Sequence, residues 1–404
     1  MSHPAISHAD RRLQSVDALR GLVMIVMALD HVRDFFHRAA MSSQPTDLRV
    51  ASAAVFLTRW VTHVCAPVFM LTAGLGAYFY LVRRSPTGEG GWKRGNRSRG
   101  QLSWFLVSRG LWLIVLELTV MQFAYNFDIS SSYPIFMLVL WILGACMVVL
   151  AGLIWLPMPA IAVLSIAVIV LHHLWDGVRV WNLVHQVSVF QAAGRTVIAP
   201  YTLVPWFAVM ALGFCMGPLF EKTPEERRRL LLRIGWAATL AFVIVRALNV
   251  YGDPSPWAAQ ALPPRTLLSF LNTTKYPPSL SFLLMTLGPA MLVLAWLETK
   301  ALSRSNPLVV FGRVPLFYFV AHFFLAHALA VLMAVFTYGA AAWSFMFQPL
   351  PSMGGPAAAF PEGFGYDLWV TYVMWCVVVG MLYPACLWFS RIKERRRDWW
   401  LSYL

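Results

Sequence analysis

The chain of 404 residues contains ten apolar runs of about 20 residues, and this recurrence constrains the fold more than any other feature. A helix of about 20 apolar residues is long enough to cross the hydrocarbon core of a bilayer. Only 12% of the residues are charged and the mean hydropathy is +0.63, which leaves too little polar cover for a soluble domain of this size. The sequence therefore predicts an all-α, polytopic integral membrane protein that forms a single transmembrane domain over residues 1–404.

The charges of the connecting segments predict the orientation of the chain. The predicted spans cover about residues 16–37, 52–82, 104–124, 133–155, 158–174, 201–220, 232–250, 279–298, 314–337 and 367–390. If the N-terminus is cytoplasmic, the cytoplasmic segments carry 21 Lys and Arg residues and the far-side segments carry 6. Cytoplasmic loops are enriched in these residues, so we expect both termini in the cytoplasm. The same distribution accounts for the net charge of +14 without a nucleic-acid partner.

The first predicted span is unusual because ionisable residues occur along its whole length. Asp17, Arg20, His31 and Asp34 fall on one stripe of a helix, and Asp30, Asp34 and His37 fall on an adjoining stripe. An ionisable residue inside a span costs about 2–3 kcal/mol and usually faces a cavity or another protein group. Positions at the membrane interfaces do not explain Asp30 and His31, which lie about 15 Å of helix rise beyond Arg20. Asp30 and His31 are therefore candidate site residues.

The second predicted span supplies two further candidates. Arg59 and His63 are four residues apart and share a helix face. The short loop between the first two spans makes them expected neighbours, at the depth of Asp30 and His31. A salt bridge between Arg59 and Asp30 that only joins the two helices is the alternative interpretation, and the two roles can coexist.

Three more candidates come from the second half of the chain. Lys275 and Tyr276 stand before a Pro-Pro pair at the outer rim of a span, where they are suited to bind an anionic or sugar group or to anchor the chain at the interface. His322 lies inside the ninth span. A histidine in that position is either a site residue or a core residue that is bonded to a backbone carbonyl.

Histidine beside a carboxylate is suited to general-base catalysis, because the carboxylate orients the ring and stabilises its cation. In an acyl transfer the imidazole takes a proton from the attacking group or itself accepts the acyl group, and Arg59 can stabilise the oxyanion. The same residues can relay protons in a transporter. The sequence shows no glycine-rich phosphate loop, GxSxG motif or zinc-type cluster.

Five segments between about residues 12 and 390 form a recognisable set. They are RRLQSVDALRGLVMIVMALDHVRDFFH, TRWVTHVCAPVFMLTAG, VPWFAVMALGFCMG, FLNTTKYPPSLSFLLMTLGP and VVFGRVPLFYFVAHFFLAHALA. Together they resemble the heparan-α-glucosaminide N-acetyltransferase catalytic-domain family, in particular its bacterial branch. The resemblance implies an enzyme in the bacterial cytoplasmic (inner) membrane. It would take an acyl group from cytoplasmic acyl-CoA and transfer it to a terminal amino sugar on the far side.

The resemblance also implies roles for individual residues. The eukaryotic enzyme uses an Asn and a His around the outer end of its first helix. Aligned from SVDxxRG, the Asn position falls on His31, and the His position reaches His37 only with a gap. A basic residue on the cytoplasmic side, such as Arg20, suits the phosphates of CoA.

The sequence thus predicts a membrane acyltransferase that moves an acetyl or similar group from acyl-CoA to an amino or hydroxyl group of a glycan or small-molecule acceptor. His31 or His37 is the expected base or acyl carrier, with Asp30 as its orienting residue and Arg59 and His63 as the supporting polar residues. Acetyl-CoA is the expected co-substrate, the lipid bilayer surrounds the protein, no metal is expected, and a homodimer is left open. The alternatives are a proton-coupled transporter and a membrane scaffold whose ion pairs are only structural.

Overall fold

The computed structural model describes residues 8–83, 96–128, 133–177, 183–353, 355–396 and 398–403. The structure is mostly helical, at 73%. Within these ranges, eight helical segments are long and apolar enough to cross a membrane: Ala53–Val82, Ser98–Asn126, Met158–Trp175, Leu203–Glu221, Pro224–Leu248, Leu280–Leu297, Pro315–Phe345 and Leu368–Arg395. The helical composition is that of an integral membrane protein, as the sequence predicted.

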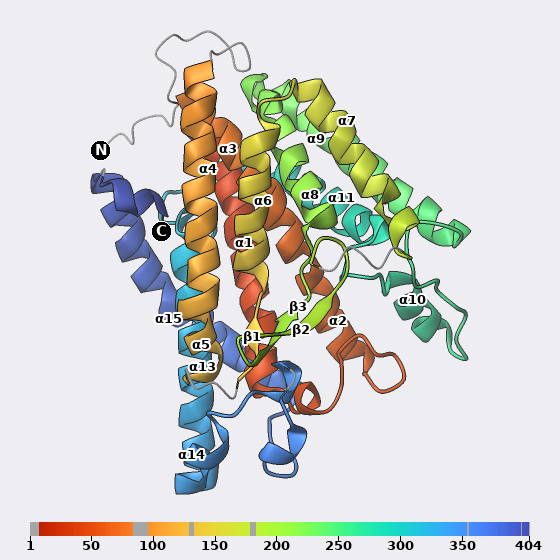
Figure 1. The fold of residues 1–404 in the computed structure, drawn as a ribbon, viewed down its shortest axis with the longest axis vertical. Coiled ribbons are helices and arrows are strands. Elements are labelled where there is room, and N and C mark those ends of the chain that lie inside the picture. The colour runs from red at the N-terminus through yellow and green to blue at the C-terminus, as the bar shows by residue number, and fades with distance from the viewer. Residues whose placement is uncertain are drawn as a thin grey trace.

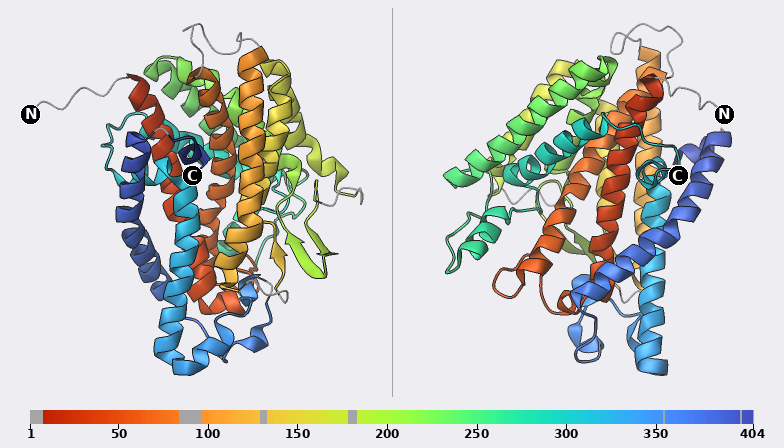
Figure 2. Two further views of the ribbon diagram at one scale, coloured as in Figure 1. Left: turned by 60° about the vertical axis from the view of Figure 1, so that its left-hand side comes forward. Right: turned by 180° about the vertical axis from the view of Figure 1, so that it is seen from behind.

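Each of the ten predicted spans corresponds to a helix. Two of them fall outside the eight apolar segments: α1 (His8–Phe36), which is rich in ionisable residues, and α6 (Val139–Leu153), which has 15 residues. The number of membrane crossings and the side of the termini therefore stay predictions. The start of α1 and the end of α15 (Leu368–Arg395) lie at the same end of the helical bundle (Figures 1 and 2).

The other helices complete a bundle in which α7 and α9 run obliquely to α1 and α4 (Figures 1 and 2). Their bounds are α2 (Ala53–Val61), α3 (Cys65–Arg83), α4 (Asn96–Leu116), α5 (Gln122–Asn126), α7 (Met158–Leu171), α8 (Leu203–Cys215), α9 (Pro224–Leu248), α10 (Pro263–Leu271), α11 (Leu280–Leu297), α12 (Pro307–Arg313), α13 (Pro315–Tyr338) and α14 (Ala342–Phe345). A 3-10 turn, Thr62–Val64, joins α2 to α3 just before Pro67, which has no N–H to continue a regular helix across this point. A π-helical turn, Glu117–Met121, joins α4 to α5.

A small sheet was not predicted, and it corrects the all-α assignment. Strands β1 (Ile135–Phe136), β2 (Ser188–Ala192) and β3 (Arg195–Ala199) have the order β1-β3-β2, with β1 parallel and β2 antiparallel to β3. Ala193 and Gly194 form the hairpin turn, both with positive φ, as a type I′ turn requires. Because β1 takes part of the predicted span 133–155, the helix there begins only at Val139.

Glycine allows α1 and α12 to pack backbone against backbone. A Cβ added to Gly21 would lie 1.8 Å from the carbonyl oxygen of Leu308, and one on Gly312 would lie 1.7 Å from that of Asp17. Small residues at helix crossings allow this approach in membrane proteins. The α3–α8 crossing is built in the same way. The contacts with α12 hold in place α1, which carries the candidate residues Arg20, Asp30 and His31.

Gly21→Ala should destabilise the protein strongly, because its methyl group has no space beside Leu308. Overpacking of a close contact costs about 1–3 kcal/mol, so we expect a lower apparent Tm, measured as the temperature that halves the monodisperse peak in detergent. The matched control is Gly380→Ala in α15, where a Cβ meets nothing within 4 Å and helix propensity improves. Equal Tm values for the two variants would contradict the close α1–α12 packing.

Candidate functional site

Two cavities lie along α1. The first, of about 400 Å³, is lined by Asp30, His31, Arg59, Lys275 and Tyr276, among others; we call it the His31 cavity. The second, of about 550 Å³, is lined by residues that include Arg20; we call it the Arg20 cavity. Both volumes are typical of small-molecule sites, which range over about 300–1,000 Å³.

A thin apolar partition separates the two cavities. Phe69 of α3, Val139 of α6 and Phe319 of α13 line both of them. The cavities are therefore contiguous, and these three side chains stand at the boundary. Arg20 and His31 are separated along α1 by about 16 Å of helix rise, so the two cavities occupy different depths of the bundle.

The ring of His31 is held by His322 of α13. Nδ1 of His31 lies 2.6 Å from Nε2 of His322, and Nδ1 of His322 lies 3.1 Å from the carbonyl oxygen of Tyr318. A carbonyl oxygen only accepts, so His322 donates through Nδ1. The neutral His322 ring then accepts at Nε2, and His31 must donate through Nδ1. This chain of hydrogen bonds leaves Nε2 of the neutral His31 ring without a proton.

The unprotonated Nε2 of His31 can act as a base in this cavity. It makes no hydrogen bond with any residue that the structure describes, and the ring lines the cavity. The ring packs against Phe323, with ring centroids 4.1 Å apart, which fixes its plane. The geometry therefore gives His31 a defined tautomer and a defined position.

Asp30 does not orient His31, contrary to our expectation from the sequence. Its carboxylate pairs with Arg59 of α2 and with Arg33, whose Nη2 lies 3.1 Å from Oδ1 of Asp30 and 2.7 Å from Oδ1 of Asp34. The anticipated Arg59–Asp30 salt bridge is therefore present, and both partners line the His31 cavity. The physical reason is that two guanidinium groups compete for this carboxylate, while the ring of His31 points to α13.

Lys275 and Tyr276 form another wall of the His31 cavity, together with Tyr201. Nζ of Lys275 is 5.2 Å from the ring centroid of Tyr276, and the rings of Tyr276 and Tyr201 meet edge to face at 5.2 Å. Burial alone would raise the pKa of Tyr276, but the charges of Lys275 and Arg59 bring this pKa below its ordinary value. Within the described part of the chain Lys275 forms no salt bridge, so it adds positive charge to the cavity.

Two predicted residues lie apart from both cavities. His37 follows the end of α1, where its backbone pairs with Tyr366. His63 is buried in the 3-10 turn against the ring of Phe282, at 5.4 Å between centroids. Neither side chain lines a cavity. The structure thus gathers Asp30, His31, Arg59, Lys275 and Tyr276, with His322 directly behind His31.

The Arg20 cavity is strongly basic. Arg20 donates a hydrogen bond to the carbonyl oxygen of Thr72 at 2.6 Å. Among the described residues, the charged side chains that line this cavity are Asp17, Arg20, Arg109, Arg313 and Lys393. Four cationic groups and one carboxylate therefore line the cavity, and one of the four, Arg313, also pairs with Glu394. Of the four, our sequence analysis identified only Arg20; the signal for Arg109 was its position inside a predicted span.

Three further residues that line the His31 cavity, Asp34, Tyr125 and Tyr201, were not selected as site residues from the sequence. Asp34 follows His31 by three residues on the same helix face, and this spacing was the available signal. The hydroxyl of Tyr125 donates to the buried carboxylate of Glu117 at 2.7 Å, a contact that depends on the π-helical turn and that no sequence pattern indicated.

Comparison with known proteins agrees with the resemblance seen in the sequence. The family model described as heparan-alpha-glucosaminide N-acetyltransferase, catalytic, matches residues 12–255. No curated protein matches the chain. The matched range is more than half of the chain and contains Arg20, Asp30, His31 and Arg59, whereas Lys275 and the α13 residues lie beyond it. The family name denotes an acetyltransferase, and the long apolar helices of this chain indicate that it is a membrane acetyltransferase. The chain therefore belongs to the heparan-α-glucosaminide N-acetyltransferase catalytic-domain family.

Proposed function

We propose that the protein transfers an acetyl group from acetyl-CoA, bound in the Arg20 cavity, to an amino or hydroxyl group of a glycan or related acceptor in the His31 cavity. Family membership supports the reaction class. The observation that carries the proposal is the pair of contiguous cavities, one basic and one containing an unprotonated histidine nitrogen. A donor and an acceptor can meet at their common boundary.

The Arg20 cavity has the chemistry that a CoA donor requires. Its four cationic side chains suit the phosphate groups of CoA, because hydrogen bonds between Arg or Lys and phosphate are charge-assisted and strong. Tyr80 and Phe105, which also line this cavity, stack with their ring centroids 4.1 Å apart. They give it an aromatic wall against which a purine base can pack.

The apolar partition can shield the reactive thioester of the donor from water. Phe69, Val139 and Phe319 are apolar, so a thioester that passes between them is shielded from water. Exclusion of water protects a reactive group from hydrolysis and strengthens electrostatic interactions near it. The partition therefore favours transfer to a bound acceptor over simple hydrolysis.

His31 supplies the proton transfers. Its Nε2 takes a proton from the acceptor amine or hydroxyl as the acceptor atom attacks the thioester carbon. The carbon–sulfur bond then breaks, and the thiolate leaving group receives that proton from Nε2. His322 accepts the Nδ1 proton of His31 in a hydrogen bond throughout, and so maintains the ring tautomer. Direct attack by Nε2, to give an acyl-histidine, uses the same nitrogen.

Arg59 is the donor that we assign to the oxyanion of the tetrahedral intermediate. Its guanidinium lines the His31 cavity and is held in place by Asp30. A preorganised cation in a site shielded from water stabilises developing negative charge more than it would in bulk water. Asp30 therefore acts on the reaction through Arg59 rather than through His31.

Purified protein and acetyl-CoA labelled in the acetyl group test this proposal. We expect saturable binding of acetyl-CoA, and release of free CoA thiol when glucosamine or a glucosamine-terminated oligosaccharide is added. Label that stays on the protein without acceptor would indicate the acyl-histidine route. No binding of acetyl-CoA at millimolar concentration would overturn the proposal and favour a proton-coupled transporter.

A further inference from the structure

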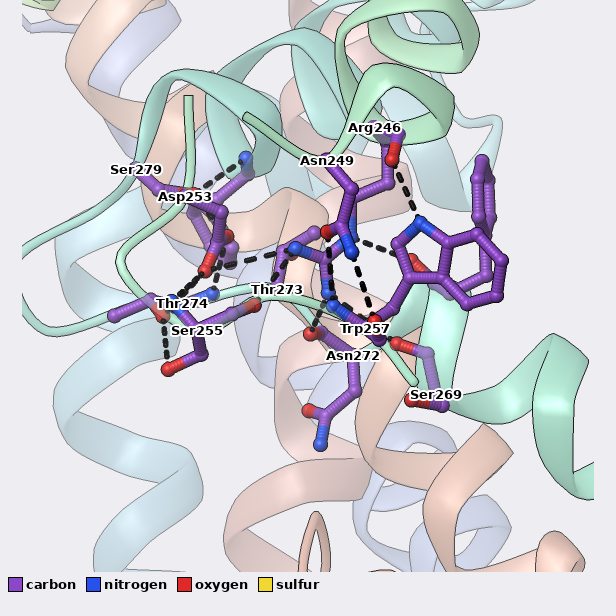
Figure 3. Close-up of polar contacts among 12 residues, drawn as sticks. Arg246, Asn249, Asp253, Ser255, Trp257, Ser269, Asn272, Thr273, Thr274 and Ser279 are labelled. Carbon is purple, nitrogen blue, oxygen red and sulfur yellow. Dashed lines mark hydrogen bonds and ion pairs between the residues drawn. The ribbon is translucent and has the colours of Figure 1, made fainter. Parts of the chain in front are cut away.

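The segment that carries Lys275 and Tyr276 has no regular structure of its own between α10 and α11. Its backbone groups therefore need other partners, and irregular backbone in a membrane protein is tolerated where protein or a water-filled cavity surrounds it. Two side chains that line neither cavity, Arg246 and Asp253, bond to the backbone of Asn272 and Thr274 in this segment and to the residues around it (Figure 3).

Arg246, in the last turn of α9, forms hydrogen bonds with the backbone on both sides of α10. Its side chain is buried, at 2% exposure. The guanidinium donates to the carbonyl oxygens of Ser255 at 2.8 Å, Phe270 at 3.0 Å, Ser269 at 3.3 Å and Asn272 at 2.8 Å. Ser255 precedes α10 and the other three lie at its end, so one rigid guanidinium fixes the entry and the exit of α10.

Asp253 forms hydrogen bonds with both ends of the loop that contains Lys275 and Tyr276. Its carboxylate accepts hydrogen bonds from the backbone N–H of Thr274 at 2.9 Å, from the Thr274 hydroxyl at 2.8 Å and from the Ser279 hydroxyl at 2.6 Å. The N–H of Ser279 also donates to the carbonyl oxygen of Thr274 at 2.9 Å. Lys275 and Tyr276 therefore stand at the tip of a tight loop, clamped on both sides by one carboxylate.

Further contacts join this loop to the rest of the site. Arg246 lies 3.7 Å from Asp253, so the two anchors form one unit. The side-chain amide of Asn272 donates to the carbonyl oxygen of Thr46 at 3.1 Å, in the loop after α1. Residues Ser43, Gln44 and Pro45 of that loop line the His31 cavity. The anchored segment is thus continuous with the cavity wall.

We propose that Arg246 and Asp253 are positioning residues that preform the Lys275–Tyr276 wall and thereby set the affinity of the His31 cavity for the acceptor. The role rests on the proposed function, since the acceptor is assigned to that cavity. Neither residue touches the Arg20 cavity, so the donor should bind as before when they are changed. A change at either residue should therefore weaken acceptor binding without weakening donor binding.

Asp253→Asn tests the inference, because it keeps the side-chain size and removes the charge and one oxygen acceptor. We expect the KM for glucosamine-terminated acceptor to rise at least tenfold while the Kd for acetyl-CoA is unchanged. Lys275→Ala should raise the same KM, and the double variant should show no further increase, because residues that act through one another are not additive. The matched control is Asp367→Asn, an exposed carboxylate beside Arg38, which should leave both constants unchanged.

A second readout does not depend on activity. Asp253→Asn should accelerate hydrogen exchange at the amides of Thr274, Lys275, Tyr276 and Ser279 and leave exchange in α1 unchanged. Thr274→Val removes one hydrogen bond to Asp253 and should give the same exchange pattern with a smaller increase. This variant replaces Asp253→Asn in the experiment if Asp253→Asn does not fold. Unchanged exchange, or KM effects that add in the double variant, would overturn the positioning role. An inactive wild type with accelerated exchange in the variant would instead overturn the proposed function alone.

Discussion

Replacement of His31 by Gln should lower kcat for acetyl transfer by about 10²–10⁴-fold, the usual contribution of a general acid–base residue. Gln is similar in size and forms hydrogen bonds, but it cannot accept and return a proton near neutral pH. The Kd for acetyl-CoA should stay unchanged, because His31 does not line the Arg20 cavity. Single-turnover measurement of free thiol, alongside equilibrium binding of acetyl-CoA, separates these two quantities.

The matched controls are the other histidines of the same region. His327→Gln removes a buried histidine from α13 that bonds to the carbonyl oxygen of Ala124 and lines neither cavity. His37→Gln removes the other histidine that the sequence suggested as the base. Both variants should keep kcat within about threefold of wild type. Loss of activity in His37→Gln with full activity in His31→Gln would refute the assignment of the base.

Replacement of Arg20 by Gln should raise the KM for acetyl-CoA by about 10- to 100-fold, with kcat retained at saturation. A hydrogen bond to a charged group contributes about 1.5–3 kcal/mol, and each 1.4 kcal/mol corresponds to a factor of about ten. Arg109→Gln in the same cavity should act in the same direction. Initial rates over a range of acetyl-CoA concentrations give both constants.

The control for lost positive charge is Arg228→Gln, an exposed residue of α9 outside both cavities. It changes the net charge by the same amount and should leave the KM for acetyl-CoA unchanged. If Arg20→Gln and Arg228→Gln behave alike, the Arg20 cavity does not bind the donor.

The helices were predictable because membrane helices need long apolar runs, and these are visible along the chain. The span predicted at 133–155 was wrong at its start, since Ile135 and Phe136 pair with β3 instead of continuing the helix. The β2–β3 hairpin had a local signal in the Ala193-Gly194 pair between β-branched stretches, which the search for spans overlooked. Apolar length alone does not distinguish a buried strand from the end of a helix.

The candidate site was predictable where its residues are close in sequence. The Arg59–Asp30 pair follows from two helices joined by a short loop. The His31–His322 hydrogen bond joins residues 291 positions apart, and it depends on how α1 packs against α13. The convergence of Arg109, Arg313 and Lys393 on Arg20 likewise needs three further helices, α4, α12 and α15, to meet α1. No local pattern in the sequence encodes such packing.

Transfer between the two cavities is tested most directly in proteoliposomes with the donor and the acceptor on opposite sides. Acetyl-CoA labelled in the acetyl group is enclosed in the vesicles, glucosamine is supplied outside, and labelled N-acetylglucosamine is measured in each compartment. For molecules whose Arg20 cavity faces inward, the account predicts labelled product outside and free CoA inside, abolished in His31→Gln. Labelled product that forms only on the side of the donor would contradict transfer through the partition.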